Sequence, residues 1–205
     1  MQNFSWKSLI SGKMDFILGI SDIADVKKCP ILPMVAFIGA SNVGKSTLIN
    51  TICNDQNLSR TSKFPGHTRQ VNIFNLNSKV LLADMPGYGY AKRSKAEIFA
   101  LRNLIFNFIA VAQSLRLVNV LVDVRRGLRQ HDIEIIEHLS IKERPIQIIL
   151  TKSDQVSPIE QLRERDKMVI NLRNLFGIET KVIPFSNKFA LGLKELGASL
   201  VDCLS

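Results

Sequence analysis

GASNVGKS, residues Gly39 to Ser46, follows a short apolar run, MVAFI, at residues 34–38. The eight residues match GxxxxGK[ST], the phosphate-binding loop or P-loop, and the apolar run predicts a buried strand before it. Its glycines let backbone N–H groups turn toward an anion, and the N-terminus of the helix expected next adds partial positive charge. We expect Lys45 to reach the β- and γ-phosphates of a nucleotide and the Ser46 hydroxyl to bind Mg²⁺. The motif alone leaves ATP and GTP open.

The chain on either side of this motif alternates strands and helices. We predict strands over 34–38, 71–76, 80–83, 117–124, 146–150 and 181–185, and helices over 45–53, 94–113, 131–141, 157–176 and 193–204. Segment 71–76 alternates apolar and polar residues, as an edge or half-exposed strand does. Ser94 with Glu97 and Ser157 with Glu160 have the spacing of capping boxes. The alternation predicts an α/β fold: a doubly wound, mostly parallel sheet with helices on both faces, in three α/β/α layers.

Length and composition fit one domain with a short extension. Residues 1–33 lack a strong period and predict an N-terminal arm packed on a domain of residues 34–205. Of the 205 residues, 46% are hydrophobic, which excludes a disordered or low-complexity chain. No apolar run reaches the roughly eighteen residues of a membrane span, and the first residues do not resemble a signal peptide. The three cysteines lie far apart, so we expect neither disulfides nor a zinc site, and a reducing cytoplasm.

The charge is strongly basic, with 27 Lys and Arg against 18 Asp and Glu and a net charge of +9. This excess favours a polyanionic partner such as RNA, although many bacterial proteins are simply basic. The basic residues gather in three loops, and we expect these loops to share one face beside the nucleotide. They are Arg60, Lys63 and Arg69; Lys92, Arg93 and Lys95; and Arg125, Arg126 and Arg129.

A second motif, Asp84-Met85-Pro86-Gly87, ends the strand predicted at 80–83. A carboxylate at that strand end faces the P-loop and is suited to holding a Mg²⁺-bound water. Gly87 has no side chain, so its backbone N–H can approach a γ-phosphate closely. Asp-x-Pro-Gly is also ordinary turn chemistry. Its place after a P-loop favours a nucleotide-sensing switch.

A third motif, Thr151-Lys152-Ser153-Asp154, follows the strand predicted at 146–150. The Asp154 carboxylate can accept hydrogen bonds from both N1–H and the 2-amino group of guanine. Adenine lacks that donor pair and would leave a buried carboxylate unpaired. The Lys152 stem is expected either to lie over the base or to brace the P-loop. The three motifs together favour guanine over adenine.

The motifs together resemble the translation-factor-type P-loop GTPases, which are Era-like. The stretch DMPGYGYAK at 84–92, PGHT at 65–68 and DVRRGLRQHDIEIIEHL at 123–139 further resemble the EngB (YihA/YsxC) family of bacterial ribosome-assembly GTPases. The resemblance implies a G domain that hydrolyses GTP to GDP with Mg²⁺. It also implies a GTP/GDP switch in assembly of the large ribosomal subunit, with its rRNA and ribosomal proteins as partners. The family has been associated with septation, which can be an indirect effect of failed ribosome assembly.

The resemblance also implies roles for single residues. Thr68 resembles the switch I threonine, which joins Ser46 as a Mg²⁺ ligand, with Asp84 acting through a water. Lys45, Thr68 and Gly87 are implied to stabilise the transition state, and Phe185-Ser186-Asn187 to contact the guanine O6. The residues expected around the nucleotide are Gly39, Ala40, Ser41, Asn42, Val43, Gly44, Lys45, Ser46, Thr47, Gly66, His67, Thr68, Arg69, Gln70, Asp84, Met85, Pro86, Gly87, Thr151, Lys152, Ser153, Asp154, Phe185, Ser186 and Asn187.

The chain departs from the family at a few positions. Arg69 stands where the family has Gln, and Asn187 where it has a small residue. The helix expected at 94–113 lacks the family's tryptophan.

Tyr88 occupies the place of the water-orienting glutamine of many GTPases, so hydrolysis should be intrinsically slow. The ribosome or a K⁺ ion held by Asn42 would then stimulate it; alternatively, Asn42 only stabilises the turn. Tyr88 and Tyr90 either stack on RNA bases or pack within the protein. A non-catalytic guanine-nucleotide sensor, a metabolic kinase and a septation factor are the alternative functions. We expect a monomer without a membrane partner.

Overall fold

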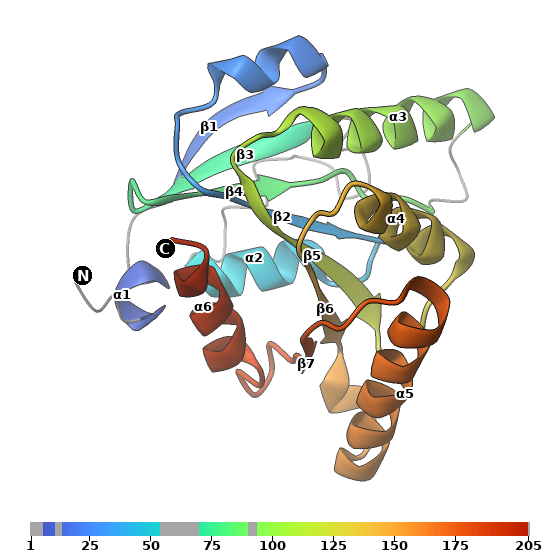
Figure 1. The fold of residues 1–205 in the computed structure, drawn as a ribbon. Helices are drawn as coiled ribbons and strands as arrows, with labels where there is room; N and C mark the ends of the chain where they lie inside the picture. The colour runs from blue at the N-terminus through green and yellow to red at the C-terminus, as the bar shows by residue number, and fades with distance from the viewer. Residues whose placement is uncertain (1–5, 11–13, 54–69, 90–93, 205) are drawn as a thin grey trace.

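The computed structural model describes residues 6–10, 14–53, 70–89 and 94–204. At the centre of the fold is a seven-stranded sheet with the strand order β1-β3-β4-β2-β5-β6-β7 (Figure 1). Strands β2, β4, β5, β6 and β7 are parallel, whereas β1 and β3 run antiparallel to their neighbours. The strands are β1 (Met14–Ile20), β2 (Met34–Gly39), β3 (Val71–Leu76), β4 (Val80–Asp84), β5 (Leu115–Asp123), β6 (Ile146–Thr151) and β7 (Val182–Pro184).

Helices cover both faces of the sheet, which confirms the predicted α/β/α layers. One face packs against α3 (Lys95–Val111), α4 (Gln130–Ile141) and α5 (Pro158–Phe176). The other packs against α1 (Trp6–Ile10), α2 (Lys45–Cys53) and α6 (Leu193–Asp202). The short 3₁₀ helices η1 (Ile23–Lys28) and η3 (Ser153–Gln155) lie in connections. No helix in the described part of the chain is long and apolar enough to cross a membrane.

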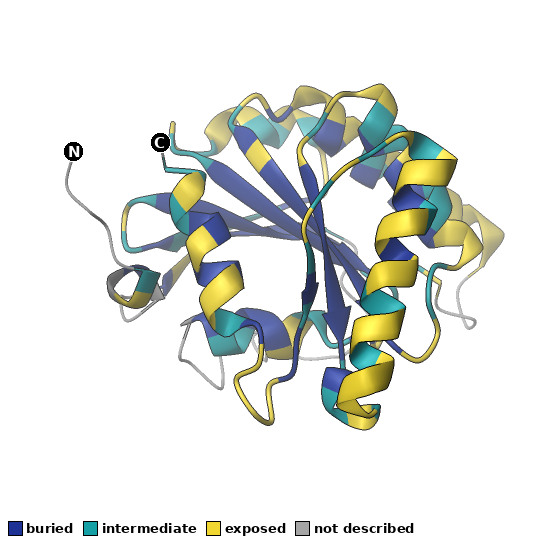
Figure 2. Ribbon diagram, turned by 60° about the horizontal axis from the view of Figure 1, so that its bottom comes forward, coloured by how far each residue is buried: buried dark blue, intermediate teal, exposed yellow. Residues whose placement is uncertain are grey.

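The central strands are buried along their length, and the helices expose only their outward sides (Figure 2). All six residues of β2, all five of β4 and all six of β6 are buried. Burial on both faces explains why these strands read as continuous apolar runs in the sequence. The predicted strands and helices all form, with ends that differ by up to a few residues. Both predicted capping boxes are present, Ser94 with Glu97 on α3 and Ser157 with Glu160 on α5.

The amino-terminal segment contains a strand that the sequence did not predict, because residues 14–20 form β1 at the edge of the sheet. Strand β1 pairs with β3, and a bulge between Phe16 and Leu18 breaks its register. Since only Met14 and Ile20 of β1 are buried, the sequence shows no regular alternation there. Strand β3 was predicted as an edge or half-exposed strand, and this is wrong: β1 covers its free edge, and five of its six residues are buried. The division at residue 33 stays a prediction.

The order of the strands determines where a ligand would bind. Strand β2 lies between β4 and β5, so the chain leaves β2 toward one side of the sheet and later crosses to the other. In open α/β sheets, ligands occupy the crevice at the carboxyl ends of the strands where this reversal occurs. The loops after β2, β4, β5 and β6 all start at that edge. The three sequence motifs belong to these loops.

Candidate functional site

The loop between β2 and α2 has the geometry of an anion-binding turn. Asn42 has φ +65° and Gly44 φ +106°, the left-handed region that suits glycine, and α2 begins at Lys45. The loop is tied to the segment after β4, because Ser41 N–H donates to the Tyr88 carbonyl at 2.8 Å. Ser46 and Thr47 are exposed in the first turn of α2. Their hydroxyls are therefore accessible at the helix N-terminus.

Lys45 and Asp84 form an ion pair across this edge of the sheet. Asp84 is the last residue of β4, and only 10% of the Lys45 side chain and 9% of the Asp84 side chain are exposed. The next residue, Met85, is fixed by its N–H to the Phe37 carbonyl of β2 at 3.0 Å. The pair brings a carboxylate to the first turn of α2. Asp84 and Ser46, the residue after Lys45 in α2, carry oxygen atoms of the hard type that Mg²⁺ prefers.

Gly87 lies directly against the P-loop. A Cβ at Gly87 would come within 3.1 Å of Ser41 Oγ and 3.4 Å of Ser41 Cα, so the two loops approach as closely as a glycine allows. Together with the Ser41–Tyr88 hydrogen bond, this contact fixes the DMPG segment to the P-loop. The segment is therefore placed to respond to what the P-loop binds.

Tyr88 packs within the protein. Its hydroxyl donates to Asp132 Oδ1 at 2.5 Å, and Asp132 Oδ2 accepts the Arg129 N–H at 2.8 Å at the start of α4. Desolvation raises the pKa of Asp132, although the hydrogen bonds from Tyr88 and Arg129 oppose that rise. Desolvation, assisted by the Asp132 charge, raises the pKa of Tyr88 well above its usual value. The hydroxyl therefore stays protonated and engaged.

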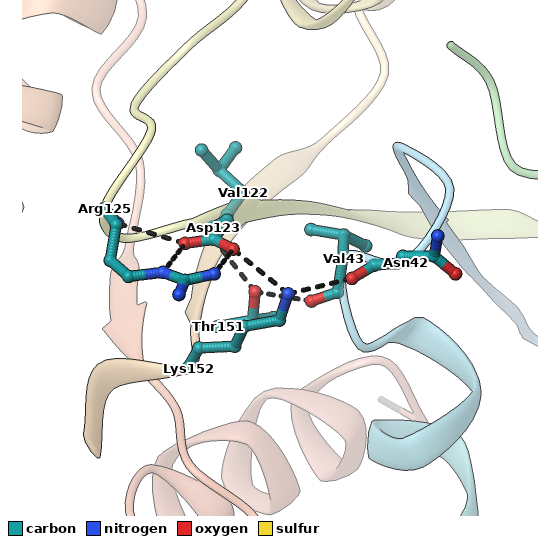
Figure 3. A network of polar contacts seen from close by, with 7 residues as sticks. All are labelled: Asn42, Val43, Val122, Asp123, Arg125, Thr151 and Lys152. Carbon is teal, nitrogen blue, oxygen red and sulfur yellow. Dashed lines mark hydrogen bonds and ion pairs between the residues drawn. The ribbon is translucent and has the colours of Figure 1, made fainter. Parts of the chain in front are cut away.

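The loop after β6 braces the P-loop, as one of the two interpretations of Lys152 predicts. Lys152 Nζ donates to the Asn42 carbonyl at 2.9 Å, and Thr151 Oγ1 donates to the Val43 carbonyl at 2.7 Å (Figure 3). Two consecutive residues of one loop thus hold two consecutive carbonyls of the other. The backbone at Lys152 is left-handed, with φ +59°.

Asp154 is oriented from the loop after β7. Ser186 Oγ donates to Asp154 Oδ1 at 2.7 Å, and Ser153 N–H donates to the Phe185 carbonyl at 3.1 Å. Asn187 Oδ1 accepts a hydrogen bond from Thr51 of α2 at 3.0 Å. The segments TKSD and Phe185-Ser186-Asn187, 31 or more residues apart in sequence, therefore form one unit around the Asp154 carboxylate.

Sequence reasoning missed the part that Asp123 plays. This buried residue ends β5, and its carboxylate lies 3.1 Å from Lys152 Nζ and forms two side-chain hydrogen bonds with Arg125, at 2.6 and 2.9 Å. Arg125 first, and Lys152 as well, hold the pKa of Asp123 far below its usual range despite burial. The sequence pattern that could have identified Asp123 is an Asp at the end of a strand, two residues before an Arg. Arg125 was expected on an open basic face, but it is committed to an ion pair.

The remaining predicted residues say less about the site, because many of them lie outside the described part of the chain. Gly66, His67, Thr68, Arg69, Tyr90 and the basic residues Arg60, Lys63, Lys92 and Arg93 lie outside the described residues. Gln70 is directed to the β1–β3 side, where its Nε2 donates to Asn72 Oδ1 at 2.9 Å. Arg126 and Arg129 line a hollow beside Ser41 and Asn42, which places two exposed basic side chains next to the P-loop.

A family model described as "50S ribosome-binding GTPase" matches residues 34–152. A probable GTP-binding protein EngB from Rickettsia akari is 43% identical over 131 residues, which are 64% of this chain and 61% of that protein. Its counterpart from Rickettsia felis is 45% identical over 124 residues, 60% of this chain and 58% of that protein. The chain thus spans about three fifths of the length of these curated relatives.

Solved structures show the same fold. The crystal structure of a probable GTP-binding protein engB has a TM-score of 0.67 at 24% identity, covering 83% of this chain and 98% of that one. Era in complex with MgGDPNP and a segment of 16S ribosomal RNA has a TM-score of 0.63 at 20% identity, covering 83% and 56%. The resemblance to EngB proteins is confirmed, and the chain belongs to the 50S ribosome-binding GTPase family.

Proposed function

We propose that this protein is a GTP-binding switch and slow GTPase that acts in assembly of the large ribosomal subunit. The guanine assignment rests on two hydrogen bonds made by the TKSD loop and its Asp154. Lys152 holds this loop to the P-loop, and Ser186 orients the Asp154 carboxylate. These contacts support a site in which the P-loop and the Asp154 carboxylate keep fixed positions relative to each other, one to bind phosphate and the other to read the base. Asp154 would accept from N1–H and the 2-amino group of guanine, and adenine would leave it unpaired.

The phosphates would be bound by the P-loop amides, Gly87 N–H and Lys45. Lys45 would exchange Asp84 for the β- and γ-phosphates, which frees that carboxylate to hold a Mg²⁺-bound water. The oxygen ligands fit Mg²⁺, with Ser46 and Thr68 as direct ligands. When bound, the ion would neutralise charge on the phosphate oxygens. The segments proposed to surround the nucleotide are Gly39–Thr47, Gly66–Arg69, Asp84–Gly87, Thr151–Asp154 and Phe185–Asn187; Gln70 is left out because it bonds to Asn72 on the β1–β3 side.

Hydrolysis would be slow without a partner. Tyr88 replaces a water-orienting glutamine, and its hydroxyl is engaged by Asp132 rather than free to act on water. The same contact favours a second candidate function, a sensor in which nucleotide binding rather than turnover matters. Multiple turnovers of GTP in the presence of ribosomal subunits would reject the sensor.

A K⁺ ion held by Asn42 is the proposed intrinsic stimulus. Asn42 is exposed in the P-loop with φ +65°, so its amide oxygen is accessible to a cation. We expect K⁺ to raise turnover relative to Na⁺, and Asn42→Ala to remove that difference. Equal rates in the two salts would leave Asn42 as a turn residue only.

The proposed partner is the large ribosomal subunit or its precursor. The family description, the net charge of +9 and the exposed Arg126 and Arg129 beside the P-loop support an rRNA partner that senses the nucleotide. The protein would act in the cytoplasm, where subunits assemble. A requirement in cell division would follow indirectly from failed assembly.

Co-sedimentation with purified subunits tests this role. We expect retention on the large subunit with a non-hydrolysable GTP analogue but not with GDP, weakening as salt is raised. Retention in neither state would contradict the ribosomal role while leaving guanine-nucleotide binding intact.

A further inference from the structure

Asp123 is the most heavily hydrogen-bonded carboxylate of the described site. It is only 5% exposed, at the end of β5. Oδ1 accepts from Arg125 N at 3.1 Å and Arg125 Nε at 2.9 Å. Oδ2 accepts from Arg125 Nη2 at 2.6 Å and lies 3.1 Å from Lys152 Nζ. Figure 3 shows this carboxylate between the guanidinium of Arg125 on one side and Lys152, with the P-loop beyond it, on the other.

Lys152 connects this carboxylate to the P-loop. Its ammonium forms an ion pair with Asp123 Oδ2 at 3.1 Å and donates a hydrogen bond to the Asn42 carbonyl at 2.9 Å. A lysine carries a compact charge on a flexible four-carbon stem, so one carbonyl does not fix its position. Two anchors on different loops do, and the ionised Asp123 supplies the stronger one. Arg125 in turn fixes the rotamer of Asp123, because a guanidinium that binds both carboxylate oxygens defines its plane.

We propose that Asp123 is a positioning residue that couples the base-reading loop, residues 151–154, to the P-loop through Lys152, with Arg125 holding its carboxylate in place. The inference rests on the proposed guanine-nucleotide site and adds to it a residue outside the three motifs. Asp123 touches neither base nor phosphate in this scheme. It acts by fixing where Lys152 and, through the backbone, Asp154 lie. The low pKa of Asp123 agrees with this arrangement, since the carboxylate stays ionised.

The consequence is a specific defect in base discrimination. Asp154 would distinguish guanine from hypoxanthine through the 2-amino group, which IDP lacks and GDP has. That contact needs the carboxylate at the correct distance from the base, whereas most of the phosphate contacts come from the P-loop itself. If Asp123 positions the loop, its loss reduces the preference for GDP over IDP. If Asp123 only stabilises the fold, both affinities fall together and their ratio stays constant.

The first variant, Asp123→Asn, keeps the shape of the side chain and removes its charge. The second variant, Arg125→Gln, changes a residue on the surface and removes the guanidinium that bonds to Asp123. The matched control is Arg165→Gln. Arg165 also pairs with a nearby aspartate, because its Nε and Nη2 both donate to Asp166 Oδ1, at 3.0 and 2.8 Å, on the exposed side of α5. The dissociation constants of GDP, IDP and ADP are measured by titration calorimetry with Mg²⁺. Urea unfolding of each variant is measured alongside.

We expect the IDP-to-GDP ratio of dissociation constants to fall by about tenfold in Asp123→Asn, because sub-ångström misplacement weakens a directional contact steeply. Arg125→Gln should lower it less, and Arg165→Gln should leave it at the wild-type value. An unchanged ratio in Asp123→Asn overturns the inference, even if both affinities drop. Should that variant not fold, an unchanged ratio in Arg125→Gln does the same. A wild-type protein that binds GDP no better than ADP would instead overturn the proposed function itself.

Discussion

The hydrogen bond between Tyr88 and Asp132 joins the DMPG segment to helix α4, and Tyr88→Phe removes only that bond. The phenyl ring can keep the edge-on contact that Tyr88 makes with His131, at 6.3 Å between centroids. The backbone hydrogen bond from Ser41 to the Tyr88 carbonyl is likewise independent of the side chain. The substitution therefore tests a single O–H donor at the position where many GTPases carry a catalytic glutamine.

The magnitude follows from the surroundings of Asp132. A hydrogen bond to an ionised group contributes about 1.5–3 kcal/mol, and loss of its donor leaves a buried acceptor short of one partner. Asp132 is 4% exposed, but it keeps the 2.8 Å bond from Arg129 N–H on its other oxygen. We therefore expect the lower part of that range, a loss of about 1.5–2 kcal/mol in the free energy of unfolding at pH 7.

Urea unfolding of the wild type, Tyr88→Phe, Asp132→Ala and the double variant forms the assay, a double-mutant cycle that isolates the pairwise contribution. A coupling energy of at least about 1 kcal/mol is expected, since the two groups are in direct contact. Coupling below about 0.3 kcal/mol would refute the reasoning, because it would mean that the hydroxyl and the carboxylate stabilise the fold independently.

The pH dependence gives the same prediction a second test. Burial raises the folded-state pKa of Asp132 above the 3.8 of an unperturbed aspartate, so this residue lowers stability as pH rises from 3.8 through the folded-state pKa. The Tyr88 bond opposes that rise. Its removal should therefore cost little below about pH 3.8, where the carboxyl is protonated in both states, and progressively more as pH rises. A Tyr88→Phe penalty that is constant from pH 3 to pH 7 would contradict this.

Three further changes test other parts of the molecule. Lys45→Ala should abolish GDP binding in titration calorimetry, because it removes the P-loop lysine proposed to bind the phosphates; wild-type affinity would contradict that role. Asp154→Asn should shift preference from GDP to xanthosine diphosphate, and unchanged GDP binding would contradict the base-reading role. Gln147→Leu should lower unfolding free energy by about 1–3 kcal/mol, because buried Asn119 Oδ1 loses a 2.6 Å hydrogen bond. An unchanged urea midpoint would refute that last expectation.

The sequence predicted the central fold because its signals were local. Apolar runs identified β2, β4 and β6, and the residues of both capping boxes identified the starts of α3 and α5. Strand β1 escaped detection because it lies at the sheet edge with a bulge and three exposed residues in a row, so its pattern resembles a loop. The burial of β3 followed from that omission, since only a strand at 14–20 covers its edge.

The motifs predicted which loops meet at the site, and the structure adds how those loops hold one another. Lys152 reaches Asn42, 110 residues earlier in the chain, and Tyr88 reaches Asp132, 44 residues later. Such pairs have no spacing rule, because the sheet topology rather than the local chain brings them together. The contact of Lys152 with the Asn42 carbonyl therefore decides between the two interpretations of Lys152.

The site has two kinds of residue, and they respond differently to substitution. Lys45, Ser46 and Asp154 would touch the nucleotide, so their types follow from phosphate, Mg²⁺ and guanine chemistry and can be read from a motif. Asp123 and Asp132 touch only protein: one holds Lys152 against the P-loop, and the other holds Tyr88 against α4. Both are buried carboxylates, one at the end of β5 and the other in the first turn of α4, yet their pKa values move in opposite directions. Two cationic partners favour the charged form of Asp123, whereas one hydroxyl and one amide do not offset the burial of Asp132. Acidification should therefore weaken the Asp132 contact to Tyr88 before the Asp123 contact to Lys152, so the DMPG segment should loosen at a higher pH than the base-reading loop.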